Sequence, residues 1–220
     1  MLEYSTKIRE ISARLLKECR VDMIIGFKKG SMPLMNEPCM VKKVDDVDKL
    51  VWDGSCGINL ANYLPGRKEK IGIIAKGCDS RNIVTHIIEN KIEREQLTII
   101  GVPCKGMIDK HKVKNQVRGE ITDVQETSDK VTVRTDAGET VLDRTEMLQQ
   151  NCTVCIHRNP VIYDEIVSEP VPEQENVDRY AEVREIESMT SEEKWNTFEQ
   201  LVSPCIRCYA CRNACPLCYC

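Results

Sequence analysis

Two short apolar runs joined by an amphipathic segment constrain the fold of this 220-residue chain more than any other feature. Residues 70–77 and 97–103 each have the length and composition of a buried strand. The segment between them repeats its apolar residues at helical spacing, and Asp79 with Ser80 can cap the helix at its start. A strand–helix–strand unit of this kind predicts two parallel neighbouring strands. We therefore expect an α/β fold with a small parallel sheet.

The rest of the first 160 residues extends this domain. We predict an amphipathic helix over 4–19, a buried strand over 22–27 and two short helices within 45–64 that are broken at Gly54. The segment from Gly30 to Pro38 reads as a loop, because glycine and proline punctuate it.

Residues 117–143 change character, because Thr and Val alternate with polar residues around a turn at DAG. This pattern predicts a short antiparallel β insertion. A C-x2-C loop follows it and completes an α/β domain that we assign to residues 1–160.

The C-terminal quarter is different in charge and in cysteine content. Residues 161–195 hold eleven acidic residues against three basic ones and include the stretch EPVPEQEN. We assign residues 161–190 to an acidic linker. A helix over 191–202, capped by Ser191, then leads into a ferredoxin-like segment that we assign to residues 191–220.

Bulk composition excludes several classes of function. The net charge is −4 and only 5% of residues are aromatic, which disfavours nucleic-acid binding. The apolar runs are too short to span a bilayer, and the N-terminus does not resemble a secretory signal. Thirteen cysteines, an odd number, argue against a disulfide framework and favour metal ligands or redox thiols. We expect a cytoplasmic protein, and oxygen-sensitive metal chemistry would suit an anaerobic setting.

The strongest motif is the final stretch CIRCYACRNACPLCYC. Its first four cysteines have the spacing C-x2-C-x2-C-x3-C followed by proline, which is the bacterial ferredoxin run for a 4Fe–4S cluster. A structural zinc site is the alternative, although zinc usually takes two C-x2-C pairs that are further apart. Two more cysteines look like the start of a second set, so we expect the chain to continue beyond its last residue. The candidate ligands here are Cys205, Cys208, Cys211, Cys215, Cys218 and Cys220.

Five cysteines of the α/β domain are candidate ligands of a second cluster. Cys78 and Cys104 each follow a predicted parallel strand, and open α/β sheets bind ligands at that edge. Cys152 and Cys155 form the C-x2-C pair, and Cys56 lies between glycines that allow a bulky group to approach.

Other residues have a simpler interpretation. Cys19 and Cys39 are taken as small buried apolar residues. Lys76 is taken as part of a solvated basic face, although it could also contact an anionic cofactor or partner.

These segments together resemble a known family. DDVDKLVWDGSCGINLANYL, IGIIAKGCDSRNIV, TIIGVPCKGMID and CTVCIHRNPVIYD resemble the β subunit of deazaflavin-coenzyme (coenzyme F-420) reducing hydrogenases and formate dehydrogenases, in particular its iron–sulfur relatives. The resemblance implies an electron-transfer subunit whose partners are hydrogenase, formate dehydrogenase or heterodisulfide-reductase-like subunits. It implies cluster ligation by Cys104, Cys152 and Cys155, and by Cys56 and Cys78. The family's FAD has no evident motif in this sequence.

Three hypotheses follow for function. The leading one is an iron–sulfur electron-transfer subunit of an anaerobic oxidoreductase complex, with two 4Fe–4S clusters. The second is an FAD-containing oxidoreductase subunit that reduces a flavin or deazaflavin-type carrier, with FAD near Cys78 and Cys104. The third is a zinc-binding structural subunit.

Overall fold

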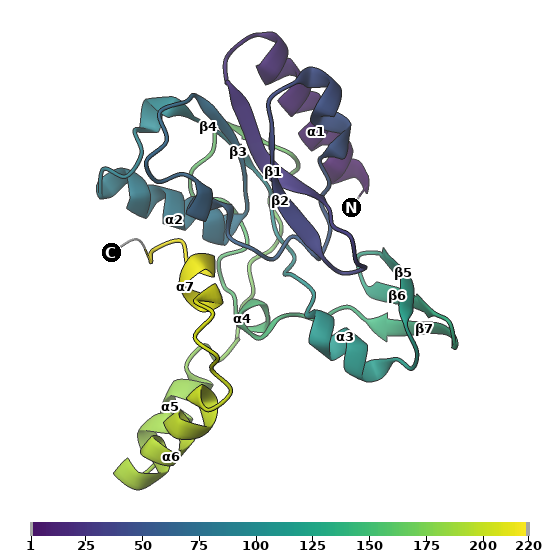
Figure 1. Ribbon diagram of the computed structural model, residues 1–220, viewed down its shortest axis with the longest axis vertical. Helices are drawn as coiled ribbons and strands as arrows, with labels where there is room; N and C mark the ends of the chain where they lie inside the picture. Colours follow the sequence, from purple (N-terminus) through teal and green to yellow (C-terminus); the bar gives the residue numbers. More distant parts are fainter. Residues whose placement is uncertain (1, 219–220) are drawn as a thin grey trace.

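The computed structural model describes residues 2–218 and contains two separate sheets (Figure 1). The larger sheet has five strands, and four of them run parallel to their neighbours. Its strands are, in spatial order, β2 (Asn36–Val41), β1 (Met23–Lys29), β3 (Ile71–Ala75), β4 (Leu97–Gly101) and β8 (Glu165–Ile166). The fold is therefore a mixed α/β arrangement with a mostly parallel sheet, as predicted.

The hydrophobic core lies on this sheet. Every residue of β3 is buried, as expected for a central parallel strand covered on both faces. Helix α1 (Leu2–Lys17) packs Ile8 and Leu15 into the core, and α2 (Gly77–Ile88) contributes Ile83. The two helices flank the sheet in Figure 1. The sheet is therefore covered by apolar side chains from both helices.

The predicted strand–helix–strand unit is confirmed. β3 and β4 pair in parallel from Ile71 opposite Leu97 to Ala75 opposite Gly101. Helix α2 begins earlier than expected, at Gly77, because Lys76 takes the position before the helix and Asp79 lies in its first turn. The Asp79 carboxylate accepts the Lys76 backbone N–H at 3.1 Å, which closes the end of the helix.

Strand β2 was not expected, because its segment carries proline. Pro38 lies opposite Phe27 in an antiparallel pair with β1. β2 is the outer strand of the sheet, so a residue without a backbone N–H leaves no ladder bond unmade. The expected loop is therefore a β-hairpin in part.

Short helices connect these strands. Two 3₁₀-helices, Val44–Lys49 and Leu60–Tyr63, replace the two short helices predicted around Gly54, and a third spans Arg94–Gln96. Cys19, predicted as buried, is exposed. It follows the end of α1 with a φ of 52°, so its side chain leaves the helix face that meets the core.

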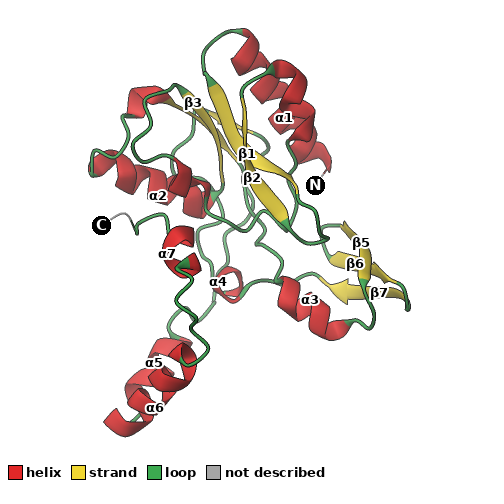
Figure 2. Cartoon of the chain, in the orientation of Figure 1, coloured by secondary structure: helices red, strands yellow, loops and turns green. Residues whose placement is uncertain are grey.

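The predicted β insertion is a three-stranded antiparallel sheet beside the main sheet (Figure 2). It has its own small core around Val131 and Val133. Its strands and the two short helices next to it are β5 (Ile121–Glu126), β6 (Lys130–Thr135), β7 (Gly138–Asp143), α3 (Lys110–Gln116) and α4 (Gln150–Thr153).

The C-terminal part forms an arm. Within the stretch predicted as a linker, residues 165–166 pair with β4 and residues 181–188 form a helix. Thr190, one residue before the predicted Ser191, caps the next helix with Glu193. Three helices lie here: α5 (Ala181–Ser188), α6 (Ser191–Val202) and α7 (Ala210–Ala214). Figure 1 shows α5 and α6 projecting from the body, while α7 lies below α2.

Across residues 2–218, no helix has both the length and the apolar content that a membrane crossing needs.

Candidate metal centres

Two cysteines lie at the same edge of the main sheet. β3 ends at Ala75 and β4 ends opposite it at Gly101. Cys78 and Cys104 each follow their strand by three residues. Because the strands are parallel and in register, equal offsets bring both thiols to the carboxyl edge.

The C-x2-C segment is bound over this edge. The Gln149 N–H donates to the Met107 carbonyl at 2.8 Å, and the Cys104 N–H donates to the Arg158 carbonyl at 2.9 Å. The Gln174 amide donates to the carbonyls of Cys152 and Cys155. These bonds hold the loop that carries Cys152 and Cys155 against the loop that carries Cys104.

The four thiols affect one another electrostatically. The pKa of Cys78 is raised to about 12, first by desolvation and then by the Asp79 carboxylate, with smaller contributions from Cys104 and Cys152. Burial raises the pKa of Cys104 to about 11, and Cys152 adds to that effect. Burial also raises the pKa of Cys152, with a contribution from Cys155. Thiols with a raised pKa, such as Cys78, Cys104 and Cys152, can be held as thiolates by a bound metal centre, and Cys78 is exposed at the surface of the edge. We call Cys78, Cys104, Cys152 and Cys155 the edge cysteines.

Backbone N–H groups are already directed at two of these sulfurs. The Gly106 N–H donates to Cys104 Sγ at 3.3 Å, and the Met107 N–H donates to Cys152 Sγ at 3.4 Å. Gly106 has a φ of +94°, and a Cβ there would come within 2.9 Å of Leu148 and 3.3 Å of Cys152. Glycine is therefore required for this close approach. N–H···S bonds of this kind surround the thiolate ligands of iron–sulfur clusters and raise their potential.

A buried cation lies beside the edge cysteines. Lys76 is only 2% exposed, which corrects its assignment to a solvated face. Its Nζ donates to the Ile58 carbonyl at 2.9 Å and to Asp79 Oδ2 at 3.0 Å. Burial alone would lower the pKa of Lys76, but the Asp79 carboxylate, Cys78 and Cys104 outweigh it and raise that pKa. Lys76 is therefore a permanent positive charge next to the thiols.

Cys56 is placed differently from the edge cysteines. It is fully buried in the main core. The Asn36 amide donates to its Sγ at 3.3 Å, and its own thiol is 3.9 Å from the Val51 carbonyl. Burial raises the pKa of Cys56 to about 12. The contact with Asn36 ties the loop that carries Cys56 to β2.

The edge cysteines are gathered without being closed into a coordination shell. In the part of the chain that the structure describes, no group of three or more Cys, His, Asp or Glu side chains has the arrangement that would hold a metal ion. The donor set nonetheless fits an iron–sulfur cluster, since it combines four thiols, two N–H···S bonds and a neighbouring cation.

The cysteines of the C-terminal run are all exposed as far as the structure describes them, and Cys220 lies outside the described residues. Arg207 and Tyr209, on either side of Cys208, have φ values of 57° and 59°. Left-handed residues within a short loop turn successive N–H groups toward one side, as in anion-binding and Fe–S-binding loops. Cys211 lies in α7, and Cys205, Cys215 and Cys218 flank it.

The C-terminal run docks on the α/β domain at two points. The Pro216 carbonyl lies 2.8 Å from Nε2 of His86, which is fully buried in α2. The Asn62 amide donates to the Asn213 carbonyl. Pro216 and Asn213 flank Cys215, so this cysteine is held near α2.

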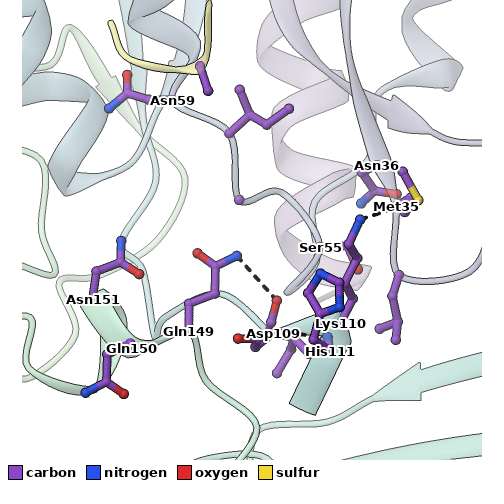
Figure 3. A pocket seen from close by; sticks show the side chains of 15 residues that line it. Met35, Asn36, Ser55, Asn59, Asp109, Lys110, His111, Gln149, Gln150 and Asn151 are labelled. Atoms are coloured by element: carbon purple, nitrogen blue, oxygen red, sulfur yellow. Dashed lines mark hydrogen bonds between the residues drawn. The ribbon is translucent and has the colours of Figure 1, made fainter. Parts of the chain in front are cut away.

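A cavity of about 650 Å³ is lined by residues of the loop before the C-x2-C pair, of the loop between the 3₁₀-helices and of α3 and α7 (Figure 3). Asn59, Gln149 and Asn151 line it with amide groups, and Ala214 of α7 closes part of its wall. Asn151 directly precedes Cys152 and Ala214 directly precedes Cys215. The cavity has the size of a small-molecule or cofactor site, and its lining includes the residues directly before Cys152 and Cys215.

Two charged residues of this region were missed from the sequence. Lys76 had a usable signal, because it directly precedes the Gly-Cys-Asp loop at the end of a buried strand. Arg144 had none, because its position after β7 reads as an ordinary turn. Arg144 is 4% exposed and bonds to the loop after Cys104.

Comparisons with known proteins show a likeness of fold. No family model and no curated protein matches the sequence. A chain of the F420-reducing NiFe hydrogenase complex from Methanosarcina barkeri, solved in a xenon derivative, superposes with a TM-score of 0.53 at 16% identity. The match covers 69% of this chain and 58% of the hydrogenase chain. The present chain therefore spans little more than half of the length of the hydrogenase chain. At this identity the likeness concerns the fold.

Proposed function

We propose that the protein is an iron–sulfur electron-transfer subunit of an oxidoreductase complex. The edge cysteines would hold one 4Fe–4S cluster, and Cys205, Cys208, Cys211 and Cys215 would hold a second. The observation that carries the proposal is the convergence of four cysteines from three separate segments on one sheet edge, with two backbone N–H groups directed at their sulfurs. When bound, such clusters supply one-electron transfer.

The residues of this chain have defined tasks in that function. Lys76 would offset the negative charge of thiolates at Cys104 and Cys152. At Cys78, the effect of the Asp79 carboxylate is larger. The N–H groups of Gly106 and Met107 stabilise thiolate sulfur. The apolar packing of Cys104 and Cys152 against the main core keeps water from their sulfurs. Together these features favour an added electron at this edge.

Helix α2 carries one of the edge cysteines near its start and contacts the C-terminal run near its end. Cys78 lies in its first turn, and His86, which contacts Pro216 beside Cys215, lies eight residues further on. A helix rises about 1.5 Å per residue, so about 12 Å of helix separates the two positions. The run, whose described cysteines are exposed, would then meet a partner protein.

The family resemblance and the fold neighbour support a role within a larger complex. The neighbouring chain comes from a hydrogenase complex. We propose hydrogenase, formate dehydrogenase or heterodisulfide-reductase-like subunits as the partners, in line with the sequence resemblance. We also propose, on the sequence resemblance, that the chain is related to the β subunit of such hydrogenases and formate dehydrogenases.

Electron paramagnetic resonance of the anaerobically purified, dithionite-reduced chain tests the proposal. We expect signals from two reduced clusters, of which Cys152→Ser removes one and Cys208→Ser removes the other. Cys39→Ser serves as the matched control, because Cys39 lies on the outer strand β2 and should leave both signals intact. A wild-type spectrum without any cluster signal would refute the proposal.

A second candidate function is favoured by the amide-lined cavity. A flavin bound there would contact the residues that directly precede Cys152 and Cys215 and would make the chain an FAD-containing oxidoreductase subunit. Amide side chains such as Asn59 and Gln149 are suited to the polar edge of a flavin ring. Flavin absorbance in the purified chain, lost on Asn151→Leu, would favour this function. Full reconstitution attempts that leave no flavin bound would eliminate it.

A further inference from the structure

Arg144 connects the β insertion to the edge cysteines. It directly follows β7, and its guanidinium is buried. Nε donates to Glu126 Oε1 at 2.6 Å, Nη1 to the Lys105 carbonyl at 2.9 Å and Nη2 to the Gly106 carbonyl at 2.7 Å. The forked side chain therefore binds one carboxylate and two consecutive backbone carbonyls.

These two carbonyls belong to the peptide groups whose N–H bonds point at sulfur. The Lys105 carbonyl shares a peptide group with the Gly106 N–H, which donates to Cys104 Sγ. The Gly106 carbonyl shares one with the Met107 N–H, which donates to Cys152 Sγ. In a trans peptide the C=O and N–H point in opposite directions. A guanidinium that holds both carbonyls therefore directs both N–H groups at the two thiols.

The arrangement also strengthens the N–H···S bonds. Each peptide group is polarised by a cation at its oxygen, and hydrogen bonds in such chains reinforce one another. The stabilisation of negative charge on sulfur thus comes from Arg144 through the two peptide groups that it holds.

The β insertion fixes the guanidinium in place. Glu126 at the end of β5 accepts from Arg144 and also from the Gly54 N–H, at 2.7 Å. The Arg144 backbone N–H donates to the Asp129 carbonyl at 2.9 Å, in the turn between β5 and β6. Both side chains of the ion pair are largely buried, so the guanidinium has little freedom to turn away.

We propose that Arg144 is a positioning residue that raises the reduction potential of the cluster held by the edge cysteines. It acts through the peptide groups on either side of Gly106. The antiparallel sheet holds its guanidinium and backbone in position. This inference rests on the proposed function, because it needs a cluster at that edge.

The test compares the potentials of both clusters in the full chain carrying Arg144→Gln or Arg144→Lys. The Gln variant removes the charge and the fork, so the edge cluster should become harder to reduce. We expect about a tenfold fall in the equilibrium constant for its reduction, or about 59 mV for one electron. The Lys variant keeps the charge without the fork and should show part of this shift. The C-terminal cluster should keep its potential in both variants and serves as the internal reference.

Several outcomes decide the inference. A Gln variant that keeps its iron and its edge-cluster potential overturns it. If the Gln variant loses iron, amide hydrogen exchange is measured in iron-free wild type and iron-free variant. Faster exchange at Gly106 and Met107 in the variant supports the inference, and equal exchange overturns it. Failure of the proposed function is recognised separately, because wild type itself would then lack a cluster at Cys104 and Cys152.

Discussion

The edge cysteines and the cysteines of the C-terminal run are brought together in two different ways. The first group comes from three segments spread over residues 78 to 155, and folding of the sheet brings it together. The second group comes from eleven consecutive residues, 205–215, whose exposed loop needs no core. The difference is in what supports the sulfurs. At the sheet edge, buried charges and backbone N–H groups are set in advance, whereas the run depends on local turns.

This contrast teaches that the two sites should respond differently to mutation. Damage to the α/β core should impair the edge site, because its geometry is tertiary. Damage to the run should remain local, because few described side chains beyond residue 174 are even partly buried.

The largest expected effect is the loss of one cluster without loss of the fold. Cys208→Ala removes a central ligand of the run and should remove about half of the bound iron. Thermal unfolding of the α/β domain should be unchanged, because Cys208 is exposed and far from the main core. Cys19→Ala, at an exposed cysteine outside both groups, is the control and should keep all iron. Unchanged iron in Cys208→Ala would disprove the assignment of the run.

The second effect concerns the buried pair beside the edge cysteines. Lys76→Met leaves the Asp79 carboxylate buried without its cation, which typically costs about 3–5 kcal/mol of unfolding free energy. Denaturant unfolding of the iron-free chain measures this cost. The double variant Lys76→Met/Asp79→Leu should recover much of the lost stability. A single variant as stable as wild type would show that the pair does not carry a buried charge.

A smaller effect is expected where the run docks on α2. His86→Phe removes the hydrogen bond to the Pro216 carbonyl and should weaken docking by about 1–3 kcal/mol. Hydrogen exchange at residues 211–218 should become faster, while the strands of the main sheet keep their protection. Adding Asn62→Ala should increase the effect, because it removes the second docking bond. Equal exchange in wild type and double variant would mean that the run is not held there in solution.

The smallest effect is a dependence of iron-free stability on alkaline pH. Burial raises the pKa of Cys56 from 9.0 to about 12 in the folded chain. The neutral thiol is favoured by folding, so its contribution is complete below pH 9 and is lost as the pH rises toward 12. Unfolding free energies at pH 8 and pH 10.5 measure this loss, and Cys56→Ala should reduce it. A Cys56→Ala chain with the same alkaline slope as wild type would contradict the prediction.

The sequence predicted the elements whose signals are local. The strands around residues 71–75 and 97–101 followed from apolar runs, and the β insertion followed from alternation. Strand β2 escaped prediction because Pro38 is tolerated only through its place at the edge of the sheet, which is a tertiary fact. Cys19 was misplaced because the register at the end of α1 decides which way it faces.

Of the candidate site, the sequence predicted the shared sheet edge of Cys78 and Cys104, while the ligand set stays a prediction. Cys78 and Cys104 could be paired because parallel strands end at one edge. Lys76 could have been found from its place before the Gly-Cys-Asp loop, whereas Arg144 acts only through contacts across the fold. Arg144 binds carbonyls 38 and 39 residues away in the sequence. The docking of the run by His86 likewise spans 130 residues and leaves no local pattern.

The most direct test of the account is an analysis of iron, acid-labile sulfide, zinc and flavin on one anaerobically purified sample of the chain. Two cubane clusters predict about eight iron and about eight sulfide per chain. Bound flavin in addition to the clusters would support the second candidate function, an FAD-containing oxidoreductase subunit. Zinc without sulfide would contradict the central claim that both groups of cysteines serve electron transfer.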